Sequence, residues 1–310
     1  MKKLTAILLA LVLLLSLAGC TDVSGEIKEP EEVISAAIEQ VEEAIEEEPT
    51  ESPEEAVQEP VHSAEETIEE AVLVDEAGVK ITAKSLDTNG LFGPEVKLLI
   101  ENTSGKNLTV QCRNSSINGY MVDNMMSVDV ADGKKANDSL TFMSSELELC
   151  GIETIADMEF SFYVFDSSDW TDYLETDMIQ ILTSAADSYT YEFDDSGDLV
   201  YEGSGVKVVV KGLSEDSILG PGIVVYLENN SDQNVTVQTR NVSINGFMVD
   251  AMFSSDVMIG KHTVDSITFL SSELEENEIT EIETVELSFH IFCTENWNTI
   301  VETESITIEF

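Results

Sequence analysis

From Ala77 onward, apolar and polar residues alternate along most of the chain with a period of two, which is the period of a β-strand. The first such stretch has apolar residues at Val79, Ile81 and Ala83. A longer stretch covers residues 158–164 and is rich in phenylalanine. Short alternating stretches with turn residues between them are typical of antiparallel sheets that pack face to face. The pattern therefore predicts an all-β protein built from β-sandwiches.

The alternating part of the chain contains one unit twice, aligned without a gap at a constant offset of 127 positions. Residues 116–123 read SINGYMVD, and residues 243–250 read SINGFMVD. Other matched pairs are Gly93-Pro94 with Gly220-Pro221, Ser144-Ser145 with Ser271-Ser272, and Trp170 with Trp297. Each unit is large enough to hold its own core, and two copies are too few for a solenoid. We expect two tandem domains, over residues 77–194 and 205–310, with a linker at 195–204.

Each copy contains an Asn-Gly dipeptide between alternating stretches, Asn118-Gly119 and Asn245-Gly246. A type I′ turn needs positive φ at both central residues, which asparagine tolerates and glycine adopts freely. The dipeptides therefore predict two tight hairpins. Valine at either glycine is expected to destabilise its own copy by ~1–3 kcal/mol, and the two effects should be nearly additive. The Ser-Ser-Glu-Leu sequence further along each copy predicts one helical turn with a serine N-cap.

The chain begins with a short basic stretch and an apolar run from Leu4 to Leu15. A run of about 12 apolar residues is too short for a stable membrane span and predicts a secretory signal over residues 1–19. Its end, Leu17-Ala18-Gly19-Cys20, resembles the bacterial lipobox. The resemblance implies a lipid on Cys20 that holds the protein on the extracytoplasmic face of the cell membrane of a Gram-positive bacterium. The alternative is an ordinary cleaved signal in which Cys20 is incidental.

Residues 20–76 are predicted to be an acidic tether, largely disordered or partly helical. Acidic residues dominate there, Lys28 is the only basic residue, and aromatic residues are absent. Such a composition cannot bury enough apolar area to offset the entropy lost on ordering. The whole sequence has 62 acidic and 14 basic residues and a net charge of -48. Nucleic acid and polyanionic polymers are therefore poor partners, whereas cations and basic proteins suit this charge.

The order of strands and turns within each copy resembles that of known extracellular domains. A leading strand, a Gly-Pro turn, a strand ending in Glu-Asn and a Val-rich strand resemble the Ig-like domains of small Gram-positive lipoproteins, including immunoprotective-antigen-type sandwiches. The similarity covers both copies and rests on turn and core residues, so it implies an architecture rather than an activity. With the lipobox and the tether, it leads us to expect a non-enzymatic cell-surface protein that binds a protein or glycan ligand. The alternatives are a structural spacer or envelope-maintenance lipoprotein without a specific ligand and, third, a calcium-binding surface domain.

Side chains that could support catalysis are scarce. Of the three histidines, His62 lies in the tether, and His262 and His290 correspond to Lys135 and Tyr163 of the first copy. A Ser-His-Asp site would therefore have to exist in one copy only. The sequence also has no Gly-rich phosphate loop, zinc-ligand spacing or dinucleotide fingerprint. We expect no enzymatic activity and no cofactor.

The cysteines beyond Cys20 are Cys112, Cys150 and Cys293, and none has a cysteine at the matching position of the other copy. A disulfide of the ancestral unit should recur in both copies, and these positions exclude that. A bond between Cys112 and Cys150 remains open, and it would leave Cys293 unpaired.

Several side chains recur at matching positions and are candidates for binding. Trp170 and Trp297 follow the long Phe-rich strand of each copy. As exposed loop residues they would contact a partner, whereas as lids on the sandwich they would belong to the core. Arg113 and Arg240 are the only arginines, and we expect each to pair with a carboxylate, the alternative being an anion-binding fork. No Asp-x-Asp-x-Asp loop is present, so no metal centre is predicted. If a cation binds, the candidate ligands are Asp123, Asp129, Asp250 and Asp256.

Overall fold

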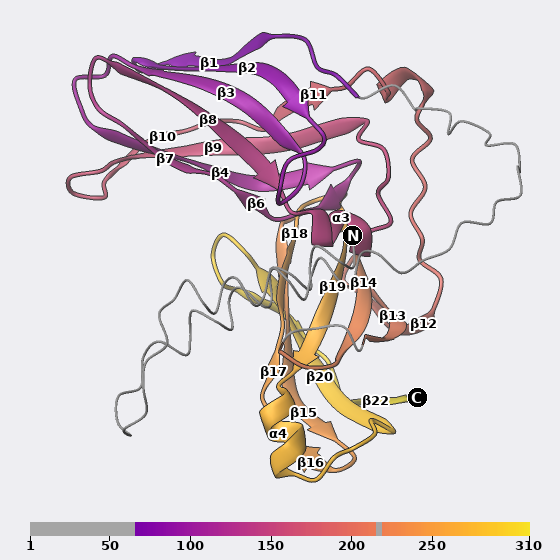
Figure 1. Ribbon diagram of the computed structural model, residues 1–310. Helices are drawn as coiled ribbons and strands as arrows, with labels where there is room; N and C mark the ends of the chain where they lie inside the picture. Colours follow the sequence, from indigo (N-terminus) through magenta and orange to yellow (C-terminus); the bar gives the residue numbers. More distant parts are fainter. Residues whose placement is uncertain (1–65, 215–218) are drawn as a thin grey trace, which may run out of the picture. The chain divides into compact units, whose positions relative to one another are not determined.

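The computed structural model describes residues 66–214 and 219–310, which belong to one compact unit, His62–Phe310 (Figure 1). The predicted signal peptide, Cys20 and most of the predicted tether lie outside the described residues. The prediction of an all-β protein is confirmed, because the described chain consists mainly of antiparallel strands. Within these residues no helix reaches the length and apolarity needed to cross a bilayer.

The strands fall into two sets of the same order, which we call repeat 1 and repeat 2. Repeat 1 consists of β1 (Ala71–Glu76), β2 (Val79–Asp87), β3 (Glu95–Asn102), β4 (Leu108–Ile117), β5 (Tyr120–Met121), β6 (Asn124–Met125), β7 (Ser127–Val130), β8 (Lys134–Phe142), α3 (Ser144–Leu149), β9 (Asp157–Asp166), β10 (Asp172–Glu175) and β11 (Ile179–Leu182). A short 3-10 turn, η2 (Ala186–Ser188), follows it. The duplication in the sequence is therefore expressed as a duplicated set of elements.

Repeat 2 begins 127 positions after repeat 1, at Asp198 against Ala71, and keeps this offset in nearly every element. It consists of β12 (Asp198–Gly203), β13 (Val206–Ser214), β14 (Gly222–Asn229), β15 (Val235–Ile244), β16 (Phe247–Met248), β17 (Ala251–Met252), β18 (Ser254–Val257), β19 (His262–Phe269), α4 (Ser271–Glu276), β20 (Thr284–Cys293), β21 (Thr299–Glu302) and β22 (Ile306–Glu309).

Each repeat packs two antiparallel sheets face to face. In repeat 1 the first sheet has the order β1-β2-β3-β8-β6. The second has the order β10-β9-β4, with β5 and β7 also paired to β4 and β11 to β9. Repeat 2 has the same two sheets, β12-β13-β14-β19-β17 and β21-β20-β15, with β16, β18 and β22 in the corresponding places. All of these pairings are antiparallel.

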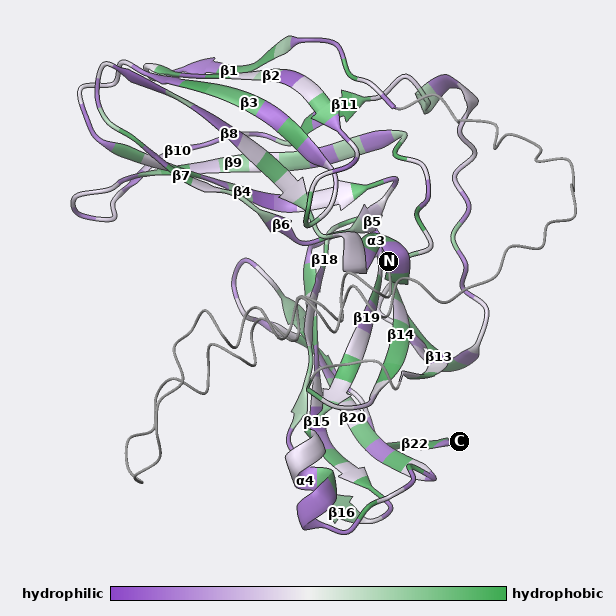
Figure 2. Ribbon diagram, viewed as in Figure 1, coloured by the Kyte–Doolittle hydropathy of each residue, from purple (hydrophilic) through white to green (hydrophobic). Residues whose placement is uncertain are grey.

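The cores follow from the alternation in the sequence. Val96, Leu98 and Ile100 of β3 point inward and are buried, while the residues between them are partly exposed. Phe160 and Phe162 of β9 are also fully buried, and their rings meet edge to face at 5.4 Å. Figure 2 shows this alternation as changes between hydrophobic and hydrophilic colour along the strands.

The first strand of each repeat lies outside the boundaries expected from the sequence. β1 falls in the segment 20–76 that we assigned to the tether, and β12 falls in the segment 195–204 that we assigned to the linker. Both assignments are wrong for these residues. Each strand forms a hairpin with the next one through a turn of two positive-φ residues, Ala77-Gly78 and Ser204-Gly205. These strands lie at a sheet edge and are mostly exposed, so acidic residues such as Asp75 and Glu76 are tolerated in them and obscure the alternation.

The Asn-Gly hairpins are confirmed in both repeats. Asn118 and Gly119 have φ values of 51° and 86°, and Asn245 and Gly246 have values of 51° and 87°. The predicted helical turns are present as α3 and α4, but the serine N-cap is wrong. The cap positions are Met143 and Leu270, without a side-chain hydrogen bond, and the serines begin the helix itself.

The two repeats are joined by strand pairing as well as by the chain. Tyr120 of β5 pairs with His262 of β19 in parallel, and the His262 amide donates to the Gly119 carbonyl at 3.0 Å. The second sheet of repeat 1 therefore continues into the first sheet of repeat 2. Three residues of repeat 2, Val209, Tyr226 and Val264, belong to the hydrophobic core cluster of repeat 1.

Candidate functional site

Two loops in matching places carry the most exposed aromatic residues of the described chain. Trp170 lies between β9 and β10, and Trp297 lies between β20 and β21. Each tryptophan is 75% exposed, so both are loop residues rather than lids on the core. Each also has a positive φ, 63° for Trp170 and 61° for Trp297.

Backbone hydrogen bonds hold both loops in the same conformation. In repeat 1 the Trp170 amide donates to the Asp166 carbonyl at 2.9 Å, and the Asp166 amide donates to the Thr171 carbonyl at 2.9 Å. In repeat 2 Cys293 takes the place of Asp166, with bonds of 2.9 Å from Trp297 and 3.0 Å to Asn298. Positive φ at a non-glycine residue costs about 1–3 kcal/mol. Because glycine would avoid this cost, tryptophan in both loops indicates that the indole itself has a use.

Each indole lies flat on a buried phenylalanine. Trp170 stacks on Phe165 with ring centroids 5.2 Å apart, and Trp297 stacks on Phe292 at 5.5 Å, each pair inclined by 15°. Phe165 and Phe292 are the next-to-last residues of β9 and β20 and are almost completely buried. One face of each indole is thereby fixed by a rigid strand, while most of the ring remains open to solvent.

The stacking continues along the strand in both repeats. Next to Phe165 lies the Tyr163 ring, 5.7 Å away, and the Arg113 guanidinium lies 3.5 Å above the centre of that ring. In repeat 2 the His290 ring lies 5.0 Å from that of Phe292. We call each set an aromatic row. The rows are Arg113, Tyr163, Phe165 and Trp170 in repeat 1, and Arg240, His290, Phe292 and Trp297 in repeat 2.

The arginines do not pair with carboxylates, so that expectation is wrong. Arg113 stacks on Tyr163, and Arg240 Nη2 lies 3.2 Å from His290 Nδ1. Among residues 66–214 and 219–310, none of the ion pairs involves an arginine. A guanidinium over an aromatic face gains cation–π and stacking energy, which lysine supplies less well at such a site. Each arginine therefore ends an aromatic row.

Ionised carboxylates surround the tryptophan loops. Two hydrogen bonds from Ser168 and, with a smaller effect, one from Lys106 lower the pKa of Asp166 to about 2. A side-chain hydrogen bond from Thr171 lowers the pKa of Asp169, and one from the Cys293 thiol lowers that of Glu295. These groups stay charged at neutral pH. Lys106 balances the charge of Asp166, so the negative charge of the loops comes from Asp169 and Glu295, and it disfavours an anionic partner and suits a neutral or basic one.

The aspartates that we named as candidate cation ligands have other partners. Asp129 accepts a hydrogen bond from Thr109, and Asp256 accepts one from Thr236, each at 2.5 Å. The backbone amides of Asp123 and Asp250 donate to the carboxylates of Glu146 and Glu273, at 2.6 and 2.7 Å. The structure does not bring these four aspartates together. In the described part of the chain, no cluster of histidine, cysteine and acidic residues is placed to hold a metal ion.

The three described cysteines are free thiols, so Cys112 and Cys150 do not form a disulfide. Burial raises the pKa of each of these two thiols to about 12, which keeps them protonated and poorly nucleophilic. The two described histidines also have structural partners. His262 contacts the Tyr226 hydroxyl at 2.6 Å, and His290 Nε2 lies 3.0 Å from the Thr299 hydroxyl.

A second feature is a hollow of about 270 Å³ where the repeats meet. Its walls carry Asp123 and Glu146 of repeat 1 and Asp256 and Asp265 of repeat 2. Burial, together with the charges of Asp123 and Asp265, raises the pKa of Glu146 to about 7. Burial also raises the pKa of Asp265. The hollow therefore holds carboxyl groups that are costly to ionise.

The raised pKa makes stability depend on pH. Between pH 4.5, the ordinary value, and about pH 7 the folded protein binds a proton on Glu146 that the unfolded chain lacks. This contribution to stability is therefore present at low pH and is lost as the pH rises through 7. We expect Glu146→Gln to raise the free energy of unfolding at pH 8 by about 1 kcal/mol, after allowance for solvent screening, and to change little at pH 5. Urea denaturation at the two pH values measures this.

Glu273→Gln is the matched control for that experiment. Glu273 accepts the same backbone hydrogen bond in repeat 2, from Asp250, but it does not line the hollow where the repeats meet. Glu273→Gln should therefore show no comparable gain in the free energy of unfolding at pH 8. An equal gain in both variants would mean that the junction of the repeats is not the cause.

Comparison with known proteins gives no functional assignment. No family model and no curated protein matches this chain. Solved structures that match include the YadV chaperone, at 11% identity over 70% of this chain and 92% of that one, with a TM-score of 0.24. Another is a protein of unknown function from Porphyromonas gingivalis W83, at 11% identity over 70% and 91%, with a TM-score of 0.20. Function is therefore argued from the site itself.

Proposed function

We propose that this protein is a non-enzymatic, lipid-anchored cell-surface protein that binds a ligand through its two tryptophan loops. The observation that carries the proposal is the exposure of Trp170 and Trp297, each 75% accessible and each fixed on a buried phenylalanine. A rigid, exposed indole offers a large apolar contact area and loses little conformational entropy on binding. Two such loops on one chain allow bivalent binding to a repetitive surface.

The chemistry around the loops narrows the class of ligand. An open indole face suits the apolar face of a sugar ring or an apolar side chain of a protein, and the charged carboxylates nearby disfavour anions. We therefore propose a neutral glycan or a neutral to basic protein of the cell envelope as the ligand. Nucleic acid is excluded from the proposal by the net charge of -48.

The proposal is tested by capture from an envelope extract that has been separated into neutral glycan and protein fractions. The bait should begin at His62, because a start at Ala77 would remove β1 from its sheet. Replacing both tryptophans by alanine should weaken capture by about tenfold or more. Leu182→Ala with Leu199→Ala is the matched control, since both leucines are exposed and lie away from the tryptophan loops. Equal capture by the two double variants would contradict the proposal.

Membrane attachment has its own test. Cys20→Ser should release the protein into the culture fluid or leave an unprocessed precursor, because two acyl chains give stable anchoring and no other membrane affinity is proposed. Cell fractionation followed by immunoblotting measures this. A variant that is cleaved after residue 19 but stays in the membrane fraction would contradict anchoring by the lipid.

The alternative is a spacer without a specific ligand, which the acidic N-terminal region favours. A spacer has no need for strained tryptophans in both loops. If neither the original protein nor the double tryptophan variant captures a ligand from the glycan or the protein fraction, the spacer is favoured.

A further inference from the structure

Each repeat has an Asn-Gly hairpin at the end of β4 or β15. The tip of this hairpin is buried in repeat 1 and exposed to solvent in repeat 2. Tyr120 at the tip of repeat 1 is buried. The equivalent residue at the tip of repeat 2, Phe247, is 49% exposed. Met248 next to it is 65% exposed, whereas its counterpart Met121 is partly buried. The tip of repeat 2 therefore presents an apolar surface that its counterpart hides.

The tip of repeat 1 is buried because repeat 2 and the segment between η2 and β12 cover it, the Phe193 ring of that segment lying 5.2 Å from that of Tyr120. The Gly119 carbonyl accepts from the His262 amide at 3.0 Å, and the Tyr120 ring lies 6.0 Å from that of His262. Beside this contact Lys261 forms an ion pair with Glu159 at 2.6 Å. The junction thus consists of the tip of one repeat on the β14–β19 face of the next, with Phe193 stacked on His262 beside the tip and an ion pair at its side.

The two surfaces that form this junction, a hairpin tip and a sheet face, each occur a second time in the chain, where they are not paired with each other. The tip of repeat 2 corresponds to the tip of repeat 1, and the β3–β8 face of repeat 1 corresponds to the β14–β19 face of repeat 2. Lys261 of repeat 2 corresponds to Lys134 of repeat 1, and Glu159 of repeat 1 corresponds to Glu286 of repeat 2. In the part of the chain that the structure describes, neither Lys134 nor Glu286 forms an ion pair. The β8 edge at Lys134 also has no neighbouring strand there, since β6 pairs only near Phe142.

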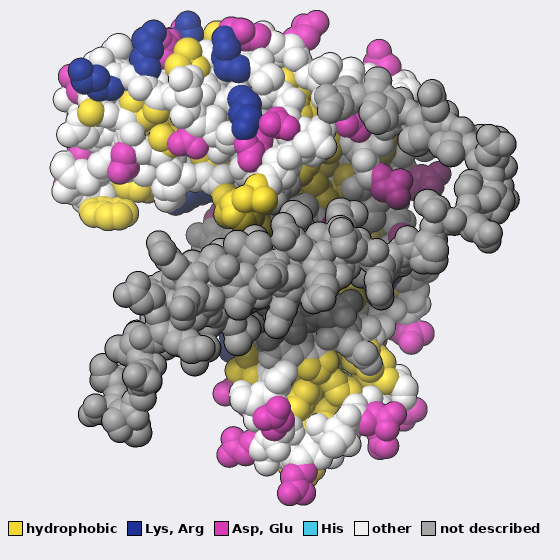
Figure 3. All heavy atoms as spheres, viewed as in Figure 1, with side chains coloured by type: hydrophobic (Ala, Val, Ile, Leu, Met, Phe, Trp, Pro, Cys, Tyr) yellow, Lys and Arg dark blue, Asp and Glu magenta, His cyan; other side chains and the backbone are white. Residues whose placement is uncertain are grey.

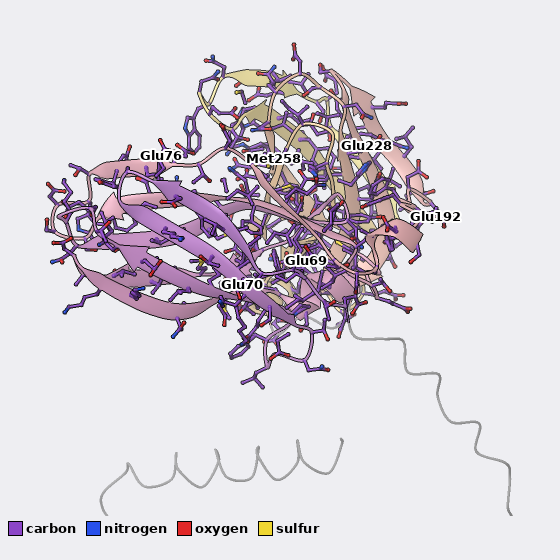
Figure 4. All side chains as sticks on the ribbon, turned by 90° about the horizontal axis from the view of Figure 1, so that it is seen from above. Glu69, Glu70, Glu76, Glu192, Glu228 and Met258 are labelled. Carbon is purple, nitrogen blue, oxygen red and sulfur yellow. The ribbon has the colours of Figure 1, made fainter. Side chains whose placement is uncertain are left out.

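The two surfaces differ in charge. The β2, β3 and β8 strands of repeat 1 hold five lysines beside four acidic residues, Asp87, Glu95, Glu101 and Asp138, whereas the end of repeat 2 around its tip and α4 is acidic. The lysines are Lys80, Lys84, Lys97, Lys134 and Lys135, and the acidic residues include Asp250, Glu273, Glu276, Glu281, Glu283 and Glu286. Figure 3 shows the basic side chains on repeat 1, with acidic ones between them, and acidic side chains over the α4 end of repeat 2. Three of the five lysines already form ion pairs: Lys84 with Glu70 (labelled in Figure 4), Lys97 with Glu95, and Lys135 with Glu101. Among the described residues this leaves Lys80 and Lys134 without an ion pair.

We propose that the tip of repeat 2 docks on the β3–β8 face of repeat 1 in a second copy of this chain, repeating the junction within the chain. Lys134 of one copy then pairs with Glu286 of the other, as Lys261 pairs with Glu159. The contact joins different surfaces of the two copies, so it is heterologous and extends into head-to-tail chains.

The strength of this contact follows from the residues that differ between the two faces. Repeat 1 has Thr82, Leu99 and Asn137 where repeat 2 has Val209, Tyr226 and Val264, and the latter three are buried in the junction. The face on repeat 1 therefore buries less apolar area and depends more on charge. The association is weak, and it weakens further as salt is added.

Sedimentation of the full-length protein in detergent, at several protein and salt concentrations, tests the proposal. We expect association that increases with concentration and falls with salt. Lys134→Glu alone and Glu286→Lys alone should each weaken it by about tenfold. An equimolar mixture of the two single variants should associate again, because each copy then finds an oppositely charged partner in the other.

Phe247→Ser is a second variant that does not depend on charge. Phe247 is exposed, so its replacement leaves the fold intact, yet it removes apolar area from the tip and should weaken association. A protein that stays monomeric at every concentration, or association that neither charge reversal changes, would overturn the proposal.

Discussion

Gly93→Ala is expected to destabilise the protein by about 3–5 kcal/mol, one of the largest effects of any single methyl group in this fold. Gly93 has a φ of 143°, which L-residues rarely adopt. A Cβ atom there would lie 2.0 Å from the Phe142 carbonyl oxygen and 2.8 Å from the Ser144 amide. These are backbone atoms at the end of β8 and the start of α3, so the clash is relieved only by separating this part of the chain from the Gly-Pro turn. Urea denaturation measures the loss.

Two further substitutions make this prediction specific. Gly220 occupies the matching position of repeat 2, with a φ of 146° and the Phe269 oxygen 2.1 Å from the added Cβ, so Gly220→Ala should cost a similar amount. Gly105 has a φ of 82° but open space around it, so Gly105→Ala should cost only the strain of about 1–2 kcal/mol. If Gly93→Ala and Gly105→Ala were equally stable, close backbone approach would not be the reason for glycine at this turn.

Gly119→Val and Gly246→Val are expected to differ, although the sequence predicts equal effects. The two glycines have nearly the same φ, so both variants carry a strain of about 1–3 kcal/mol. A Cβ at Gly119 would also lie 3.1 Å from the Phe193 ring, whereas nothing lies within 4 Å at Gly246. Phe193 stacks on His262 at 3.7 Å, so valine at Gly119 disturbs the junction of the repeats. We expect Gly119→Val to cost about 1–2 kcal/mol more than Gly246→Val.

Calorimetry distinguishes the two variants further. Gly119→Val should lower the melting temperature of both repeats, because the Gly119 carbonyl accepts a hydrogen bond from repeat 2. Gly246→Val should affect repeat 2 alone. Identical melting curves for the two variants would mean that the junction adds nothing to stability.

The strands and turns could be predicted because they depend on local pattern. Alternation identified β2, β3, β9 and their counterparts, and the Asn-Gly dipeptides identified the hairpins. β1 and β12 were missed because an edge strand that is mostly exposed needs few apolar residues and carries acidic ones. Local pattern does not distinguish such a strand from an acidic tether.

The junction of the repeats could not be predicted from periodicity, because it depends on which outward-facing residues become covered. A signal was nevertheless present in the comparison of the two copies. Asn137 of repeat 1, which is exposed, is replaced in repeat 2 by Val264, which is buried, at a position that faces outward from the sheet. A change from polar to apolar at outward positions of one copy indicates a surface that is covered in that copy only.

The candidate site was located by the sequence but not characterised by it. Matching positions identified Trp170 and Trp297, yet the sequence favoured burial as lids on the core over exposure, and the 75% exposure of both residues shows that this preference was wrong. The arginine contacts were wrongly predicted because Arg113 and Tyr163 are far apart in the sequence and meet only through the pairing of β4 with β9. Stacking of this kind depends on strand register rather than on composition.

Intrinsic fluorescence tests the central claim most directly, because Trp170 and Trp297 are the only tryptophans in the chain. The full-length protein should emit at the long wavelength of solvent-exposed indole and be readily quenched by acrylamide. Adding the captured envelope fraction should shift the emission to shorter wavelength and protect it from quenching, with Trp170→Phe and Trp297→Phe separating the two signals. Short-wavelength, unquenched emission from the free protein, or exposed indoles that no envelope fraction protects, would contradict ligand binding at these loops.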